Sequence, residues 1–117
     1  MTSPTIVAVV TDLLFQSRLR EQAQALDYEV TVTETLDAIR DALAGSPALV
    51  VLDLHVTGLD WQEAVATAKE RGVPVLAFGR HTEAQLLRSA REAGCDRVVP
   101  RSTFVEELPR LIAGLAV

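Results

Sequence analysis

The segment ALVVLDLHVTG, residues 48–58, constrains the fold of this 117-residue chain more than any other segment. Its core, Leu49–Leu52, is a continuous aliphatic run, whereas a strand with one face in water alternates apolar and polar residues. The run therefore predicts a strand buried on both faces. Asp53 follows it directly, where the strand leaves the core. Ligands of open α/β sheets bind outside the carboxyl ends of the strands, so Asp53 is a candidate site residue.

A second apolar run, Ile6–Val10, ends in the same way, on the polar pair Thr11 and Asp12. Shorter or alternating segments predict three more strands, at residues 28–33, 73–78 and 98–99. Residues 28–33 alternate apolar and polar side chains, which is typical of a half-exposed edge strand. Two of the buried strands therefore deliver acids to one edge of the expected sheet.

Apolar residues at helical spacing predict five amphipathic helices between and after these strands. Asp60 is a good N-cap for the third helix. Thr82 and Thr103 are each followed three residues later by Gln or Glu, a capping box that predicts the starts of the fourth and fifth helices. Pro109 lies inside the fifth helix and predicts a bend, because it removes one backbone hydrogen bond.

Strands and helices thus alternate strictly along the chain, at spacings that leave no room for hairpins between strands. This pattern predicts a doubly wound, five-stranded parallel sheet with five helices. No repeat, low-complexity tract or linker interrupts it. We expect residues 1–117 to form one domain.

Composition argues against several classes of partner. The formal net charge is −5 and the arginines are spread along the sequence, whereas nucleic acid binding needs clustered cations. No apolar run approaches the roughly 20 residues of a membrane span, and the first residues lack the basic start of a signal peptide. We therefore expect a cytoplasmic protein, with no membrane or nucleic acid partner, whose single cysteine, Cys95, is a buried hydrophobe without a disulfide.

Asp12 and Asp53 follow the first and third strands, which are neighbours in a sheet of this kind. Two close carboxylates repel each other unless a cation joins them, and Mg²⁺ prefers such oxygen ligands while leaving room for a phosphate. The alternative role is structural, with Asp12 capping the first helix and Asp53 capping the loop after its strand.

The segments VAVVTD, LVVLDLHVTGLD, VPVLAFGRH, AREAGCDRVVPRS and FVEEL resemble the receiver domain of two-component response regulators, over essentially the whole chain. The resemblance implies a flavodoxin-like fold with strand order 2-1-3-4-5. It also implies that Asp53 is phosphorylated by a histidine kinase, with Mg²⁺ bound by Asp12, Asp53 and the backbone carbonyl of His55. His55 itself we interpret as a solvated loop residue.

Five positions depart from the pattern of that family. Thr11 replaces a second acid at the metal site, and Gly79 replaces the hydroxyl residue that contacts the phosphate. Arg101 and Ser102 replace a lysine and the proline after it, and Val98 replaces the aromatic switch residue. These changes predict weaker metal binding and an altered structural response to phosphorylation of Asp53.

We therefore predict an atypical, stand-alone receiver, a signalling module of a two-component phosphorelay and not an enzyme. It binds a histidine kinase or other signalling protein through its fourth helix, fifth strand and fifth helix, a face that can also form a homodimer. Two mechanisms remain open: Asp53 accepts a phosphoryl group, with Arg101 near the new charge, or Asp53 pairs permanently with Arg101 and the fold is a fixed pseudo-receiver platform.

A third hypothesis is a flavodoxin-like domain that binds a small molecule. Residues 53–58 fit D-x-H-x-x-G, the pattern by which a histidine ligates cobalt in cobalamin-binding domains. In that family the pattern follows the first strand, whereas here it follows the third. Two residues keep alternative roles: His81 is a surface residue or meets a phosphate, and Trp61 packs under its helix or contacts a partner.

Overall fold

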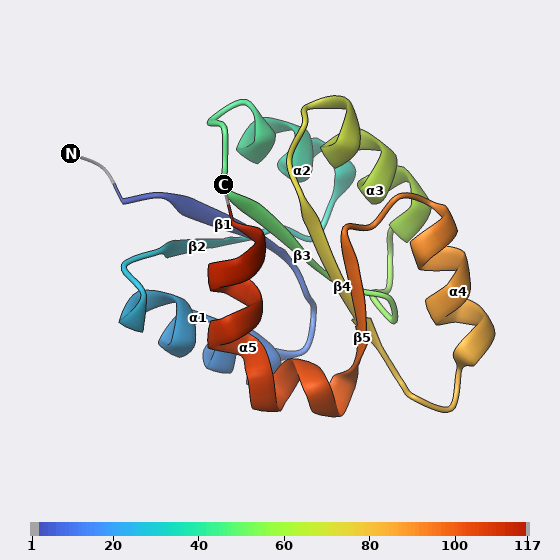
Figure 1. Ribbon diagram of the computed structural model, residues 1–117. Coiled ribbons are helices and arrows are strands. Elements are labelled where there is room, and N and C mark those ends of the chain that lie inside the picture. The colour runs from blue at the N-terminus through green and yellow to red at the C-terminus, as the bar shows by residue number, and fades with distance from the viewer. Residues whose placement is uncertain (1–2, 117) are drawn as a thin grey trace.

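The computed structural model describes residues 3–116, in which five strands and five helices alternate (Figure 1). The strands are β1 (Thr5–Val9), β2 (Glu29–Val32), β3 (Leu49–Asp53), β4 (Val75–Gly79) and β5 (Arg97–Pro100). The helices are α1 (Leu13–Ala25), α2 (Leu36–Leu43), α3 (Trp61–Glu70), α4 (Ala84–Glu92) and α5 (Arg101–Leu115). No helix in this part of the chain is both long and apolar enough to cross a membrane.

The strands form one parallel sheet in the order β2-β1-β3-β4-β5, which confirms the predicted topology. β2 lies at one edge and alternates exposed with half-buried residues, as its sequence predicted. In the centre, Leu52 pairs with Val9 of β1, and Asp53 pairs with Phe78 of β4. This register places Asp53 at the carboxyl edge of the sheet, between two neighbouring strands.

Helices cover both faces of the sheet (Figure 1). Helices α2, α3 and α4 pack on one face, where the core includes Val50 and Leu52, and α1 and α5 pack on the other, with Leu49 and Val51. All five residues of β3 are buried, which confirms the prediction drawn from its continuous apolar run. Burial on both faces explains why this strand contains no polar residue before Asp53.

The predicted helix ends are partly wrong. Asp60 caps α3 as expected, since its Oδ1 accepts a hydrogen bond from the Gln62 amide at 2.9 Å. Thr82 does not cap α4: a turn closed by the hydrogen bond from the Glu83 amide to the Arg80 carbonyl contains Thr82 and moves the cap to Glu83. Glu83 makes no side-chain capping bond.

The start of α5 also differs from its prediction. β5 passes into α5 without a loop, so Pro100 is the N-cap and Thr103 lies in the first turn. The predicted bend is confirmed, because Glu107, two residues before Pro109, has the non-helical angles φ −115° and ψ 15°. The direct junction between β5 and α5 places the first residues of the helix at the carboxyl edge of the sheet.

Candidate functional site

Asp53 is a buried acid at the carboxyl end of the central strand, with an exposed fraction of 3 %. Its Oδ1 accepts a hydrogen bond from the backbone amide of His55 at 2.8 Å. Among residues 3–116 the carboxylate has no further hydrogen bond and no ion pair. A buried charge without a cation is costly, so this arrangement favours a cation or a reacting group beside Asp53.

Asp12 follows β1, the strand beside β3, and its side chain is exposed. Its Oδ1 accepts hydrogen bonds from the backbone amides of Leu14 and Phe15, at 2.9 and 3.2 Å. Both acids therefore have the capping role of the structural alternative. In both, the bonds are made by Oδ1, so Oδ2 remains available for a ligand.

The oxygens of Asp12, Asp53 and the His55 carbonyl are the type of ligand that Mg²⁺ prefers. Within the described ranges no three Asp, Glu, His or Cys side chains gather into a metal site. Thr11 lies next to Asp12 and adds a neutral hydroxyl where a further acid would add a charge. The Oδ2 of Asp53, which makes no hydrogen bond with the described residues, is of the oxygen type that Mg²⁺ prefers, and Asp12 follows the neighbouring strand as a second candidate ligand.

Gly79, at the end of β4, stands in a filled space. A Cβ at this position would lie 3.2 Å from Leu87 Cδ2, 3.4 Å from Leu54 Cδ1 and 3.7 Å from His55 Nε2. A side chain here would require the Leu87 methyl group to shift by a few tenths of an ångström, while the contacts with Leu54 and His55 would be at ordinary distances. In this chain the position has no hydroxyl, and these three side chains lie around it.

His55 occupies this space and is not the solvated loop residue that we predicted. Its side chain is 21 % exposed, and its Nε2 accepts a long hydrogen bond, 3.4 Å, from the Arg80 amide. The same nitrogen lies 3.6 Å from the Glu83 carboxylate. The ring therefore joins the loop after Asp53 to the start of α4, and these contacts count against a cobalt ligand on Nε2.

Arg101, the first residue of α5, does not pair with Asp53. No ion pair among the described residues joins the two side chains. The Arg101 Cζ instead lies 4.6 Å from the ring centroid of Phe15 in α1, a cation–π contact. Its Nε is buried without a hydrogen-bond partner. The permanent Asp53–Arg101 pair is therefore absent, because the aromatic ring holds the guanidinium.

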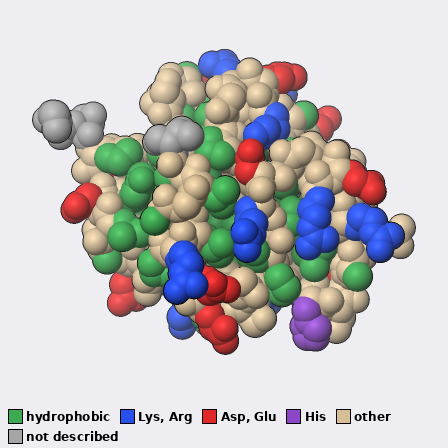
Figure 2. Space-filling view, in the orientation of Figure 1, with side chains coloured by type: hydrophobic (Ala, Val, Ile, Leu, Met, Phe, Trp, Pro, Cys, Tyr) green, Lys and Arg blue, Asp and Glu red, His purple; other side chains and the backbone are tan. Residues whose placement is uncertain are grey.

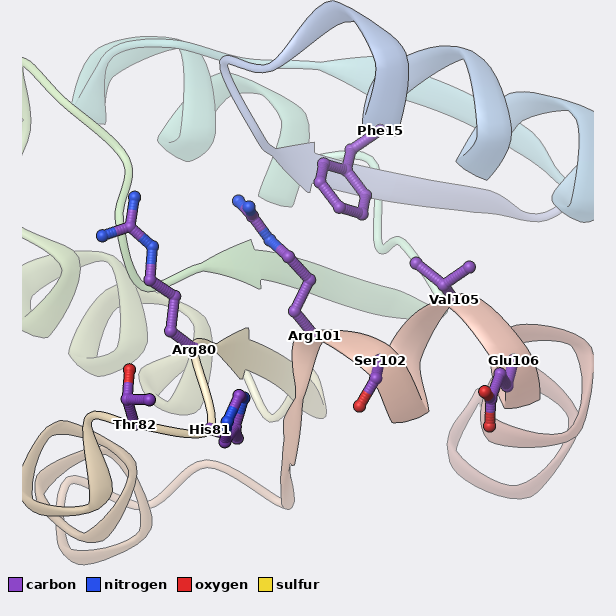
Figure 3. A pocket seen from close by; sticks show the side chains of 8 residues that line it. All are labelled: Phe15, Arg80, His81, Thr82, Arg101, Ser102, Val105 and Glu106. Atoms are coloured by element: carbon purple, nitrogen blue, oxygen red, sulfur yellow. The ribbon is translucent and has the colours of Figure 1, made fainter.

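Arg80 is a residue that the sequence reasoning missed. It follows β4, as Arg101 follows β5, and the two side chains extend in the same direction (Figure 3). Because the acids Asp12 and Asp53 follow β1 and β3, the carboxyl edge of the sheet holds two acids and two arginines on four neighbouring strands. The position of Arg80 directly after an apolar strand was the signal that could have identified it.

Val98 lies on β5 with 7 % of its surface exposed and packs into the core below α4. The position that the resemblance implied to be an aromatic switch thus holds an aliphatic side chain. Trp61 is half-buried against the same core, as one of its two predicted roles required.

Cys95 also packs against this core. Burial, as the larger cause, and the negative charge of Asp96 raise the pKa of its thiol to about 11. The prediction of a buried hydrophobe is therefore confirmed in part, because Cys95 packs against the core but is only half-buried.

Arginines that are spread along the sequence gather on one surface over α4, β5 and α5 (Figure 2). Arg91 and Arg97 line one hollow of about 430 Å³, and Arg97 and Arg110 line another of about 260 Å³. Arg88 precedes Arg91 by three residues on α4, and both are exposed. Of these four, Arg110 alone has an ion pair among the described residues, with Glu107 at 3.5 Å. We call the four residues the arginine face.

No protein-family model and no curated protein matches the sequence. Solved structures match along nearly its whole length. The signal receiver domain of a modulated diguanylate cyclase from Desulfovibrio desulfuricans G20 is 22 % identical, with a TM-score of 0.80, over 97 % of this chain and 93 % of that one. An orphan response regulator of H. pylori is 16 % identical, with a TM-score of 0.74, over 97 % and 93 %.

NtrX from Brucella abortus is 18 % identical with a TM-score of 0.82, and the match covers 98 % of this chain and 27 % of NtrX. The chain thus corresponds to about a quarter of that longer protein. These likenesses show that it has the fold of the receiver domains of response regulators.

Proposed function

We propose that this chain is a receiver domain in a two-component phosphorelay, in which Asp53 accepts a phosphoryl group from a histidine kinase. The observation that carries the proposal is the state of Asp53. Among the described residues this buried carboxylate, at the carboxyl end of the central strand of a receiver fold, makes no ion pair, and its Oδ2 makes no hydrogen bond. A carboxylate placed in this way can act as a nucleophile.

In the proposed reaction, Oδ2 of Asp53 attacks the phosphorus of a phosphohistidine. The P–O bond to Asp53 forms, the P–N bond breaks, and the imidazole leaves with the electron pair of that bond. The His55 amide holds Oδ1 and so orients the carboxylate. Mg²⁺, held by Asp12, Asp53 and the His55 carbonyl, would neutralise charge on the phosphoryl oxygens.

The test is incubation with acetyl phosphate and Mg²⁺, followed by intact mass measurement. We expect one added phosphoryl group in the natural protein and none in Asp53→Asn. Asp37→Asn is a matched control, since Asp37 lies on the exposed surface of α2, and it keeps the full adduct. Asp12→Asn should reduce the rate of labelling through weaker metal binding. The absence of an adduct at millimolar donor concentrations would overturn the proposal.

A phosphorylation-independent interaction module is the second candidate, and the arginine face favours it. Gly79 and Val98 provide neither the hydroxyl nor the aromatic ring of the usual readout. Meanwhile α4, β5 and α5 present exposed arginines that are complementary to an acidic surface on another signalling protein. A two-fold homodimer through this face would place arginines against arginines, so we favour a different, acidic partner.

This second candidate is tested by sedimentation at low and high ionic strength, and by binding of a poly-glutamate peptide. We expect a monomer in both salts, and peptide binding that weakens with salt and is lost in the double variant Arg91→Glu, Arg97→Glu. The control Arg18→Glu, Arg40→Glu changes the charge equally on α1 and α2 and should retain binding. A stable dimer, or equal binding by both double variants, would contradict the proposed surface.

A further inference from the structure

A separate cavity of about 510 Å³ lies between the β4–α4 loop, the start of α5 and the start of α1 (Figure 3). Its lining includes Phe15, Arg80, His81, Thr82, Arg101 and Ser102. Asp53 and Asp12 do not line it. The volume is within the range of cavities that bind small molecules, roughly 300–1,000 Å³.

One wall of the cavity is apolar and rigid. The ring of Phe15 packs against Phe78 and Phe104, at centroid distances of 5.4 and 6.2 Å. Phe78 and Phe104 are fully buried and stack on each other at 4.1 Å. Val105 adds an aliphatic surface from α5. The Arg101 guanidinium lies over part of the Phe15 ring, with Cζ 4.6 Å from the centroid, so the apolar surface open to a flat group is the rest of the half-buried Phe15 ring together with Val105.

Two arginines face the same cavity. Arg80 makes a long, exposed ion pair with Glu83, with 3.9 Å between Nη1 and Oε1, and Arg101 has no ion pair among the described residues. The Nε of Arg101 is buried and has no hydrogen-bond partner within residues 3–116. Such donors match a carboxylate or phosphate group. The one acid of the lining, Glu106, is exposed and lies across the cavity from Arg80 (Figure 3).

The start of α5 adds to this preference for an anion. Its N-cap is Pro100, which has no side-chain bond to the first amides of the helix. Free amides and the positive end of the helix dipole favour negative charge nearby. The hydroxyls of Thr82 and Ser102 and the ring of His81 provide further polar groups in the lining.

We propose that this cavity binds a small organic anion, a flat unsaturated ring that carries a carboxylate or a phosphate. The ring lies against the wall formed by Phe15 and Val105, and the anionic group lies between Arg80 and Arg101. The site is distinct from Asp53 and does not depend on the phosphorylation proposed there.

The test is a titration of the ¹⁵N-labelled protein with 1-naphthyl phosphate and 1-naphthoate, followed by amide chemical shifts. We expect shifts confined to residues 80–82, 101–106 and their neighbours in α1, with a dissociation constant on the order of 1 mM for ligands of this size. Inorganic phosphate, which lacks the ring, and 1-naphthalenemethanol, which lacks the charge, should each bind at least about tenfold more weakly. The ratio between the two naphthyl anions shows whether phosphate or carboxylate is preferred.

Four variants locate the site. Arg80→Ala and Arg101→Ala should each weaken binding of 1-naphthyl phosphate about tenfold. Arg40→Ala, on α2, is the matched control and should retain the affinity. Asp53→Asn should bind as the natural protein does, so loss of phosphorylation and loss of this site are separate results.

Four results would overturn the proposal: no shift with 10 mM of either naphthyl anion, shifts confined to the arginine face, binding of inorganic phosphate that equals that of the naphthyl compounds, or unchanged affinity in both arginine variants. Thermal unfolding of each variant identifies any loss caused by misfolding. Arg80→Ala decides in that case, because Arg80 is exposed and its removal leaves the core intact.

Discussion

Asp96 and Asp53 lie at opposite edges of the same sheet and have opposite surroundings. Asp96 precedes β5, and its Oδ2 accepts hydrogen bonds from Lys69 Nζ and the Val75 amide, both at 2.7 Å. The Asp96 amide in turn donates to the Val75 carbonyl. Asp53 has one amide bond and no cation among the described residues. The acid at the amino edge is therefore held by bonds that stabilise the fold, whereas Asp53 at the carboxyl edge lacks such partners among the described residues, as expected of the site proposed there.

The pKa of Asp96 reflects this difference. Partial burial acts to raise it, but the hydrogen bonds from Lys69 and the Val75 amide outweigh burial and hold the pKa below its ordinary value of 3.8. The charged form is thus stabilised by folding. At the carboxyl edge, Arg80 and Arg101 follow strands neighbouring those of the acids, and among the described residues neither makes an ion pair with Asp12 or Asp53.

The largest effect is expected for Asp96→Ala. This change leaves the Val75 amide without its side-chain acceptor and Lys69 without its ion pair, and should lower the free energy of unfolding by about 2 kcal/mol. Urea unfolding measures it. The control Asp37→Ala removes an exposed ion pair with Arg40 and should cost less than about 0.5 kcal/mol. An equal decrease in the free energy of unfolding in the two variants would show that Asp96 stabilises the fold no more than an exposed surface acid does.

Asp53→Asn is expected to change the free energy of unfolding in the opposite direction from Asp96→Ala. It removes a buried charge that has no cationic partner and keeps an oxygen for the His55 amide, so it should raise the free energy of unfolding by about 1 kcal/mol. The same urea experiment tests it. A clear loss of stability would mean that the Asp53 charge has a stabilising partner in solution, and would remove the contrast between the two edges.

A smaller effect is expected for the pH dependence of the contribution that Asp96 makes to the free energy of unfolding. Because its pKa is lower in the folded than in the unfolded state, the contribution is complete above about pH 4 and is lost as pH falls through the folded pKa. The difference in stability between the natural protein and Asp96→Asn should therefore narrow between pH 5 and pH 2. If the difference in stability stayed constant over this range, the effect of the substitution would come from altered packing and not from the Asp96 charge.

The smallest expected effect concerns the reactivity of Cys95. Burial, and then the charge of Asp96, raise the pKa of this thiol to about 11, so alkylation by iodoacetamide should be slow at pH 7 and accelerate up to about pH 11. Asp96→Ala should increase the rate at pH 8 severalfold, since it removes the negative charge. Asp53→Asn, at the other edge, should leave the rate unchanged. An increase in both variants would indicate general loosening of the fold.

Much of the fold could be predicted because it depends on local patterns. The continuous run of Leu49–Leu52 predicted a strand buried on both faces, and Asp60 was identified as a cap from its position before a helical pattern. The errors at Thr82 and Thr103 arose where a neighbouring element changed the local geometry. A turn contains the first residue, and the direct β5–α5 junction draws the second into the helix.

The sequence by itself therefore determined the alternation of strands and helices and the acid at the end of the central strand, because hydrophobic periodicity acts over a few neighbouring residues. Only the tertiary structure decided what surrounds that acid. It placed Arg101 over Phe15, the ring of His55 beside Gly79, and the arginines of α4, β5 and α5 on one surface. These contacts join residues from different helices and strands. The distances between such residues are set by the order of the strands in the sheet and by the packing of the helices on it.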